Sequence, residues 1–289
     1  MDRRSALALH VLAFAALAGL ATPALAQEEE EPSSRFSGAF QLDITNVYFF
    51  RGLLQERDGL IAQPWAELYF DAYSSETGFI RNVTLGAGVW NSMHSRETLA
   101  SDEPGWIYET DWYPLISIGL PQGFTLSTYY YWYTSPNDAF RTAQELNFKL
   151  EWDDSEALGR FALAPWANLA IETNRTAFGP DEGVGLQLGV EPTLYTFEHE
   201  RYPVSFTVPV EVGLAIDDYY EEEDGREDTF GYVSFGLSMS VPLPFVPESL
   251  GAWSFGVTAK GYYFNDTLEE LNEGDELYPM VMGSLGVEF

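Results

Sequence analysis

Hydrophobic and polar residues alternate along most of the chain after residue 34, and a period of two indicates β-strands with one apolar and one polar face. In the segment 142–152, Leu146, Phe148 and Leu150 share one face, and charged or amide residues occupy the other. In the segment 106–120, Tyr108 and Trp112 fall on the apolar face by the same rule. Helical spacing is hard to find here, so the pattern predicts an all-β protein.

About twelve segments show this alternation, each near the length of a tilted bilayer-spanning strand. The predicted strands are 37–51, 60–72, 79–90, 106–120, 124–134, 142–152, 161–173, 184–194, 204–216, 230–241, 253–264 and 278–289. Strands of secreted β-sandwiches are usually shorter, with more frequent turns. The predicted fold is therefore a transmembrane antiparallel up-and-down β-barrel of about 12 strands.

The connections between these strands alternate between two kinds. The longer, mostly polar ones are 52–59, 91–105, 135–141, 174–183, 217–229 and 265–277. The compact ones are 73–78, 121–123, 153–160, 198–202 and 242–252. Outer-membrane barrels have short periplasmic turns and longer outer loops, so the alternation favours that class.

Prolines interrupt several of the predicted strands, at positions where a closed barrel has no free edge for a missing N–H donor. They are Pro64, Pro114, Pro165, Pro192, Pro209 and Pro279. We expect some of them at strand ends or bulges, which shifts the strand boundaries.

The N-terminal residues predict export. Basic Arg3 and Arg4 precede an apolar run of Ala and Leu, and Ala24-Leu25-Ala26 fits a cleavage site. The expected organisation is a signal peptide (1–26, cleaved after Ala26), an acidic flexible tether (27–36) and an outer-membrane barrel (37–289).

Charge narrows the range of partners. The chain has 14 basic and 45 acidic residues, a net charge of −31, and no cysteine. Phosphates would be repelled, so a nucleic-acid partner is excluded. Disulfides, zinc–thiolate sites and cysteine nucleophiles are excluded as well.

The polar strand faces carry many more acids than bases, and in a barrel these faces would line the lumen. The expected lumen-lining residues are Asp43, Arg51, Glu67, Asp71, Glu109, Asp111, Glu145, Lys149, Glu151, Glu172, Glu191, Glu211 and Lys260. An acid-lined aqueous passage concentrates cations. Twelve strands are compatible with a narrow channel and also with a lumen filled by side chains.

Two long loops hold much of the remaining charge. Residues 217–229 contain eight acids and one Arg, and residues 265–277 contain six acids. The first loop includes Asp217, Asp218, Glu221, Glu222, Glu223 and Asp224. These loops are interpreted as solvated surface, with weak Ca²⁺ or Mg²⁺ association as the alternative. An EF-hand is excluded, because Tyr220 and Gly231 would occupy its first and twelfth positions.

No catalytic constellation emerges, so the protein is not expected to be an enzyme. His10 lies in the signal peptide, whereas His94 and His199 fall at opposite ends of the predicted barrel. A serine-type site could use only His94, with Ser92, Ser95 or Ser101 nearby. No metal site and no bound cofactor are expected either.

Short motifs add a resemblance. The segments NVYFFRG (46–52), QPWAELYFDAY (63–73) and GVWNS (88–92) resemble the start of the TorF-like porin family, small uncharacterised outer-membrane barrels. The resemblance covers about 60 residues and implies a barrel, with no catalytic residue and no known solute. The final Phe289 is typical of barrels that the insertion machinery recognises by their last strand.

These patterns give a leading hypothesis and two alternatives. The leading one is a narrow, cation-preferring passive channel in the outer membrane for small cationic or neutral solutes. The second is a non-conducting structural or surface-interaction barrel whose acidic loops bind divalent cations. The third is a soluble secreted β-protein.

Overall fold

The computed structural model describes residues 34–57, 59–96, 98, 106–175, 181–199, 202–220 and 228–289. The predicted signal peptide (1–26) and most of the predicted tether (27–36) lie outside these residues. Within the described ranges, no helix is both long enough and apolar enough to cross a membrane.

The protein is a closed antiparallel β-barrel, as the alternation predicted. Its sheet has 14 strand segments, and two pairs of these are halves of one interrupted strand, which gives 14 − 2 = 12 barrel strands. The uninterrupted strands are β1 (Phe36–Thr45), β4 (Ile61–Ser74), β5 (Asn82–His94), β6 (Ile107–Gly119), β7 (Phe124–Thr134), β8 (Ala143–Trp152), β9 (Trp166–Asn174), β14 (Phe230–Pro242), β15 (Ala252–Phe264) and β16 (Leu277–Glu288). Pairing of β1 with β16 completes the ring.

The two interrupted strands are neighbours. β10 (Val184–Val190) continues as β11 (Thr193–Phe197), and β12 (Val204–Thr207) continues as β13 (Val210–Asp217). Pro192 lies in the first interruption and Pro209 in the second. Proline has no backbone N–H to donate to the ladder, so regular strand pairing stops at each of these positions. These interruptions correct the single strands predicted for 184–194 and 204–216.

The other prolines sit where the ladder is open on one side. The register between β4 and β5 skips Pro64, and the register between β6 and β7 skips Pro114. Pro279 pairs with β15 but lies beyond the part of β16 that pairs with β1. Pro165 directly precedes β9. Each missing donor is therefore accommodated without opening the barrel.

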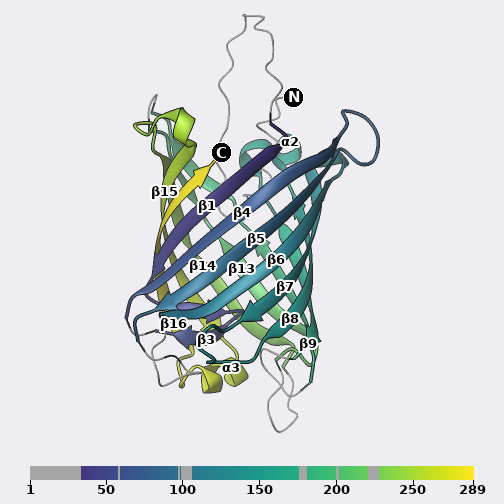
Figure 1. Cartoon of the computed structure of the whole chain (residues 1–289). Helices are drawn as coiled ribbons and strands as arrows, with labels where there is room; N and C mark the ends of the chain where they lie inside the picture. The colour runs from purple at the N-terminus through teal and green to yellow at the C-terminus, as the bar shows by residue number, and fades with distance from the viewer. Residues whose placement is uncertain are drawn as a thin grey trace, which may run out of the picture.

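The two ends of the barrel differ (Figure 1). The turn end carries the C-terminus and the short elements η1 (Pro121–Gly123), α2 (Ser155–Leu158), η2 (Gly159–Phe161) and η3 (Glu248–Leu250). The loop end carries α3 (Asp266–Leu271) and a separate hairpin, β2 (Tyr48–Phe50) with β3 (Leu53–Glu56).

That hairpin corrects the prediction of one long first strand over 37–51. The wall strand stops at Thr45, and the chain turns at Arg51 and Gly52, whose φ angles are 47° and 92°. Two consecutive positive φ values make the tight turn that joins hairpin strands. A Cβ atom at Gly52 would lie 2.7 Å from a ring carbon of Tyr232, so glycine is also required by packing.

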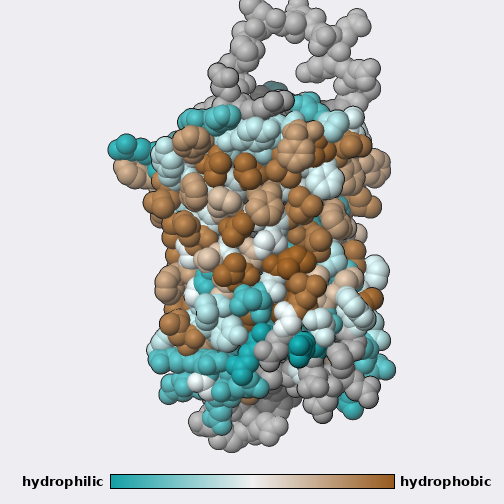
Figure 2. Space-filling model, turned by 90° about the vertical axis from the view of Figure 1, so that its left-hand side faces the viewer, coloured by the Kyte–Doolittle hydropathy of each residue, from teal (hydrophilic) through white to brown (hydrophobic). Residues whose placement is uncertain are grey.

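Apolar side chains cover the outside of the barrel. On the face that Figure 2 shows, hydrophobic residues cover most of the height, and hydrophilic residues lie at the lower end and along the upper rim. The exposed set includes Phe40, Leu68, Leu85, Trp112, Ile116, Leu126, Phe148, Leu150, Leu188, Phe235, Leu237, Phe255, Val281 and Leu285. A contiguous apolar surface of this extent is unsuited to water and suited to hydrocarbon.

We expect the apolar exterior to contact lipid, which a single charge can test. Leu237 lies in the middle of β14 with 45% of its surface exposed. Leu237→Arg is expected to lower the free energy of unfolding by roughly 2–4 kcal/mol, because arginine is disfavoured at the bilayer midplane. The measurement is equilibrium urea unfolding in phospholipid vesicles.

The matched control is Leu250→Arg. Leu250 is also exposed but lies in η3 at the turn end, where the expected change is about 0–1 kcal/mol. Equal effects of the two substitutions would contradict a lipid-facing wall.

Candidate functional site in the barrel lumen

The charged residues predicted for the polar strand faces lie on the side opposite the exposed apolar residues. Among the described wall residues, buried ones are Asp43, Glu109, Asp111, Glu145 and Glu172, and half-buried ones are Glu67, Asp71, Lys149, Glu151, Glu191, Glu211 and Lys260. Arg51 is the exception, because it sits at the hairpin tip and not on the wall.

Arg51 reaches from the hairpin to the far wall. Its guanidinium forms a two-pronged ion pair with Glu145 on β8 and contacts the Tyr219 hydroxyl. It also donates to Asn147 Oδ1 at 3.1 Å, and the Tyr133 hydroxyl donates to Glu145 Oε1 at 3.0 Å. The carboxylate of Glu145 is therefore surrounded by donors in a buried position.

Electrostatics keep Arg51 and the neighbouring Tyr220 protonated. Burial alone would lower the pKa of Arg51, but the Glu145 carboxylate together with Tyr219 and Tyr133 raises that pKa above its ordinary value. Burial raises the pKa of the Tyr220 hydroxyl, which donates to the Arg51 carbonyl oxygen at 3.1 Å. Both groups therefore remain protonated donors at physiological pH.

Further contacts hold the hairpin along its length. The Tyr48 hydroxyl donates to Glu109 Oε2 at 2.9 Å, and the Tyr108 hydroxyl donates to Gln55 Oε1 at 2.7 Å. Asn272, just after α3, accepts from the Leu54 N–H and donates to the Gly52 carbonyl, each at 2.8 Å. The hairpin thus occupies the loop end of the lumen and is tied to the wall and to α3.

Tyr108 corrects a sequence prediction, because it is buried and does not face outward. Its ring stacks on His94 with centroids 4.5 Å apart. The register between β5 and β6 shifts between Ser92 and Met93, next to the start of β6. This irregularity reverses the facing that simple alternation assigns to Tyr108.

Tyrosines fill one side of the lumen between the hairpin and the turn end. Tyr113 and Tyr131 have ring centroids 4.7 Å apart, and Tyr129 stacks on Tyr131 at 5.8 Å. Glu67 accepts from the Tyr113 hydroxyl at 2.7 Å and also from Tyr69. Glu67 is therefore engaged by hydroxyl donors.

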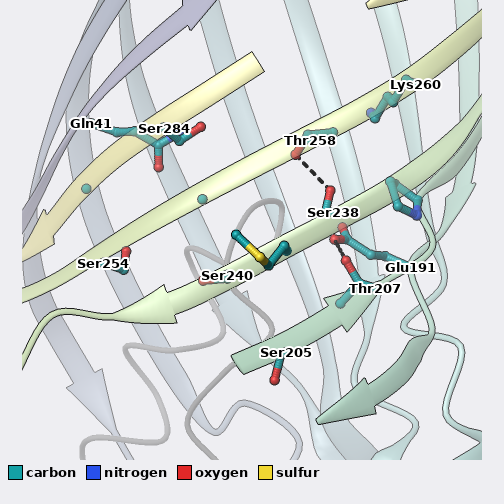
Figure 3. Close-up of a pocket in the computed structure, with 14 residues that line it drawn as sticks. Gln41, Glu191, Ser205, Thr207, Ser238, Ser240, Ser254, Thr258, Lys260 and Ser284 are labelled. Atoms are coloured by element: carbon teal, nitrogen blue, oxygen red, sulfur yellow. Dashed lines mark hydrogen bonds between the residues drawn. The ribbon is translucent and has the colours of Figure 1, made fainter. Parts of the chain in front are cut away.

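The opposite side of the lumen, toward the turn end, is hollow. A cavity of about 70 Å³, which we call the vestibule, is lined by Gln41, Glu191, Ser205, Thr207, Pro209, Ser238, Met239, Ser240, Ser254, Gly256, Thr258, Lys260, Ser284 and Gly286 (Figure 3). Small side chains on β12, β14, β15 and β16 leave this space, in contrast to the tyrosines across the barrel.

Ser92 and His94, considered as a serine-type site, do lie together. Ser92 Oγ is 2.6 Å from His94 Nε2, and His94 Nδ1 is 3.9 Å from Glu56 Oε2 on the hairpin. All three are at most 3% exposed, and none lines the vestibule. The arrangement offers no room for a substrate, so we assign it no catalytic role. Ser95 accepts from the Leu60 N–H instead, and Ser101 lies outside the described residues.

The acidic loops are only partly described. Asp217 ends β13 and Asp218 follows it, whereas Glu221, Glu222, Glu223 and Asp224 lie outside the described residues. Arg57, which directly follows the hairpin, forms ion pairs with two residues of the loop after β15, Glu273 and, at 2.6 Å, Asp275. The described residues contain no group of three or more side chains placed to hold a metal ion.

A closed barrel with an apolar exterior and charged side chains inside defines the class: a transmembrane β-barrel. No protein-family model and no curated protein matches the chain, so the TorF-like resemblance is not confirmed.

Three solved structures are similar to this chain, at low identity and with TM-scores below 0.5. An outer-membrane channel of the COG4313 group from Pseudomonas putida F1 has a TM-score of 0.48 and 11% identity, covering 93% of this chain and 100% of that one. LpxR from Salmonella typhimurium has a TM-score of 0.39 and 8% identity, covering 86% and 99%. The β-domain of the Bordetella autotransporter BrkA has a TM-score of 0.39 and 11% identity, covering 88% and 98%.

The hairpin should loosen when its ion pair is removed. Arg51→Gln leaves the buried Glu145 carboxylate without its cation, which is expected to weaken hairpin docking by roughly 3 kcal/mol, about a hundredfold. The measurement is amide hydrogen exchange of peptides covering 46–57.

Arg57→Gln is the control, because its ion pairs are partly exposed and worth under about 1 kcal/mol. Unchanged exchange in the Arg51 variant would show that the ion pair does not secure the hairpin.

Proposed function

We propose that the protein is a narrow, cation-preferring passive channel of the bacterial outer membrane, for small cationic or neutral solutes. In this proposal the turn end faces the periplasm and the loop end faces outward. The chain is exported by residues 1–26, cleaved after Ala26, and its exterior contacts outer-membrane lipid. The barrel-assembly machinery recognises the last strand, β16, and the adjoining Phe289.

The charge imbalance of the lumen carries the proposal. The ten inward acids outnumber Arg51, Lys149 and Lys260, and two of these bases are already paired, Arg51 with Glu145 and Lys149 with Glu151 at 2.8 Å. Subtracting those pairs leaves 10 − 2 = 8 acids against 3 − 2 = 1 base. Side chains held around a low-dielectric passage attract counter-ions strongly, so cations enter and anions are repelled.

The hairpin is the constriction in this proposal. It occupies the loop end, and the tyrosines occupy one side of the middle, so the remaining path runs along the wall that lines the vestibule. Passage from one end to the other therefore depends on how tightly the hairpin is docked. We expect a small conductance with the hairpin in place.

A second candidate function rests on the same observation, that the hairpin and the tyrosines occupy much of the lumen. If the hairpin never moves, the barrel is a non-conducting structural or surface-interaction protein. Its acidic loops would then bind Ca²⁺ or Mg²⁺ weakly, through residues such as Asp217 and Asp218. The pairing of Arg57 with Glu273 and Asp275 shows that part of the loop acidity is already used in holding the fold.

Planar-bilayer recording tests the channel. The purified protein should conduct with K⁺ favoured over Cl⁻, and the current should rise several-fold in Arg51→Gln, because the constriction loosens. Arg57→Gln should conduct like the parent protein. Correct folding of each variant is checked by the difference in gel mobility between boiled and unboiled samples.

Two results would overturn the channel. One is a reversal potential that favours Cl⁻. The other is no current in the parent protein and none after replacement of 48–56 by a short glycine–serine linker, which would favour the non-conducting barrel.

A further inference from the structure

The vestibule has a composition that cation passage alone does not explain. It contains a lysine, which opposes cation entry, and its lining includes many hydroxyl groups and one amide. Figure 3 shows Glu191 and Lys260 toward one end of the cavity and Gln41, Ser254 and Ser284 toward the other. One negative group, one positive group and a neutral hydrogen-bonding surface therefore face a single small space.

The backbone fixes Glu191 at the strand interruption. The Glu191 N–H donates to the Leu163 carbonyl at 2.8 Å, and the Val208 N–H donates to the Pro192 carbonyl at 3.0 Å across the two broken strands. Thr207 Oγ1 donates to Glu191 Oε1 at 2.7 Å. Among the described residues none hydrogen-bonds the second carboxylate oxygen, which leaves that oxygen available as an acceptor.

Lys260 supplies the opposite charge from β15. It pairs through its backbone with Gly236 and is half-buried. In the described part of the chain its ammonium group has no ion pair and no hydrogen bond, unlike Arg51 and Lys149. A half-buried ammonium with open donor positions is a place for an anionic group of a solute.

The hydroxyl groups complete the surface. The hydroxyl groups of Ser238 and Thr258 are hydrogen-bonded to each other at 2.8 Å, which holds both side chains in place. Ser240 and Ser254 pair with neighbouring strands through their backbone, but their hydroxyl groups form no hydrogen bond with any residue that the structure describes. These hydroxyls can therefore donate to a solute or accept from it.

We propose that the vestibule is a binding site for a small zwitterionic solute, whose ammonium group contacts Glu191 and whose carboxylate contacts Lys260. A simple cation would meet Lys260, and a simple anion would meet Glu191, so each is disfavoured by one of the two charges. A cavity of about 70 Å³ accommodates a solute with a short chain. The inference rests on the proposed function only in that the solute reaches the vestibule through the lumen.

Isothermal titration calorimetry with the full-length barrel in detergent micelles tests the site directly. The probes are glycine, 4-aminobutyrate, methylammonium chloride, sodium acetate and glycerol at matched ionic strength. At least one zwitterion should bind tenfold or more tightly than methylammonium, acetate and glycerol. Equal binding of all five, or no binding of either zwitterion, would overturn the proposal.

Variants locate the binding. Glu191→Gln and Lys260→Gln should each weaken zwitterion binding at least tenfold, and boiled and unboiled gel mobility confirms that they fold. Lys149→Gln is the matched control, because Lys149 is a lumen lysine paired with Glu151 and does not line the vestibule. Its affinity should stay within twofold, and an equal loss in this variant would show that overall lumen charge, not a site, is responsible.

The outcomes separate the two proposals. A barrel that conducts K⁺ over Cl⁻ but binds no zwitterion retains the channel and loses the site. A barrel that binds a zwitterion with the expected variant pattern but carries no current retains the site and loses the channel.

Discussion

The structure depends on one constraint, that backbone N–H and C=O groups inside a bilayer can be satisfied only by other strands. A ring of paired strands meets it, and the ladder between β1 and β16 leaves no edge. Because each strand then has one face to lipid and one to the interior, a period of two is imposed on the whole sequence. The apolar exterior and the charged interior are two results of the same requirement.

The interior is heterogeneous because side-chain size varies around the ring. Large tyrosines on β6 and β7 fill their side, and serine, threonine and glycine on β12, β14, β15 and β16 leave the vestibule open. The prolines that interrupt β10–β11 and β12–β13 lie on the open side. They release the backbone from regular pairing and place Glu191 at the cavity. Features that weaken a strand locally therefore shape the space inside.

Most of the wall could be predicted from sequence, because lipid contact forces alternation and the facing of a residue follows from its parity. The hairpin could not, since Tyr48–Phe50 and Leu53–Glu56 alternate as a wall strand does. The adjacent Arg51 and Gly52 were the available signal, because a two-residue turn with glycine favours a hairpin. The same alternation predicted which acids are on the inward face, but it could not predict which of them form ion pairs, because Glu145 pairs with an arginine 94 residues away.

The docked hairpin has a consequence for the order of assembly. Its tip is held by groups 94, 168 and 220 positions away along the chain, namely Glu145, Tyr219 and Asn272. Contacts of such long range form late, because the intervening chain must first be brought together. The hairpin comes early in the chain, but it therefore docks only after the last strands have formed. Its docking marks the completion of folding.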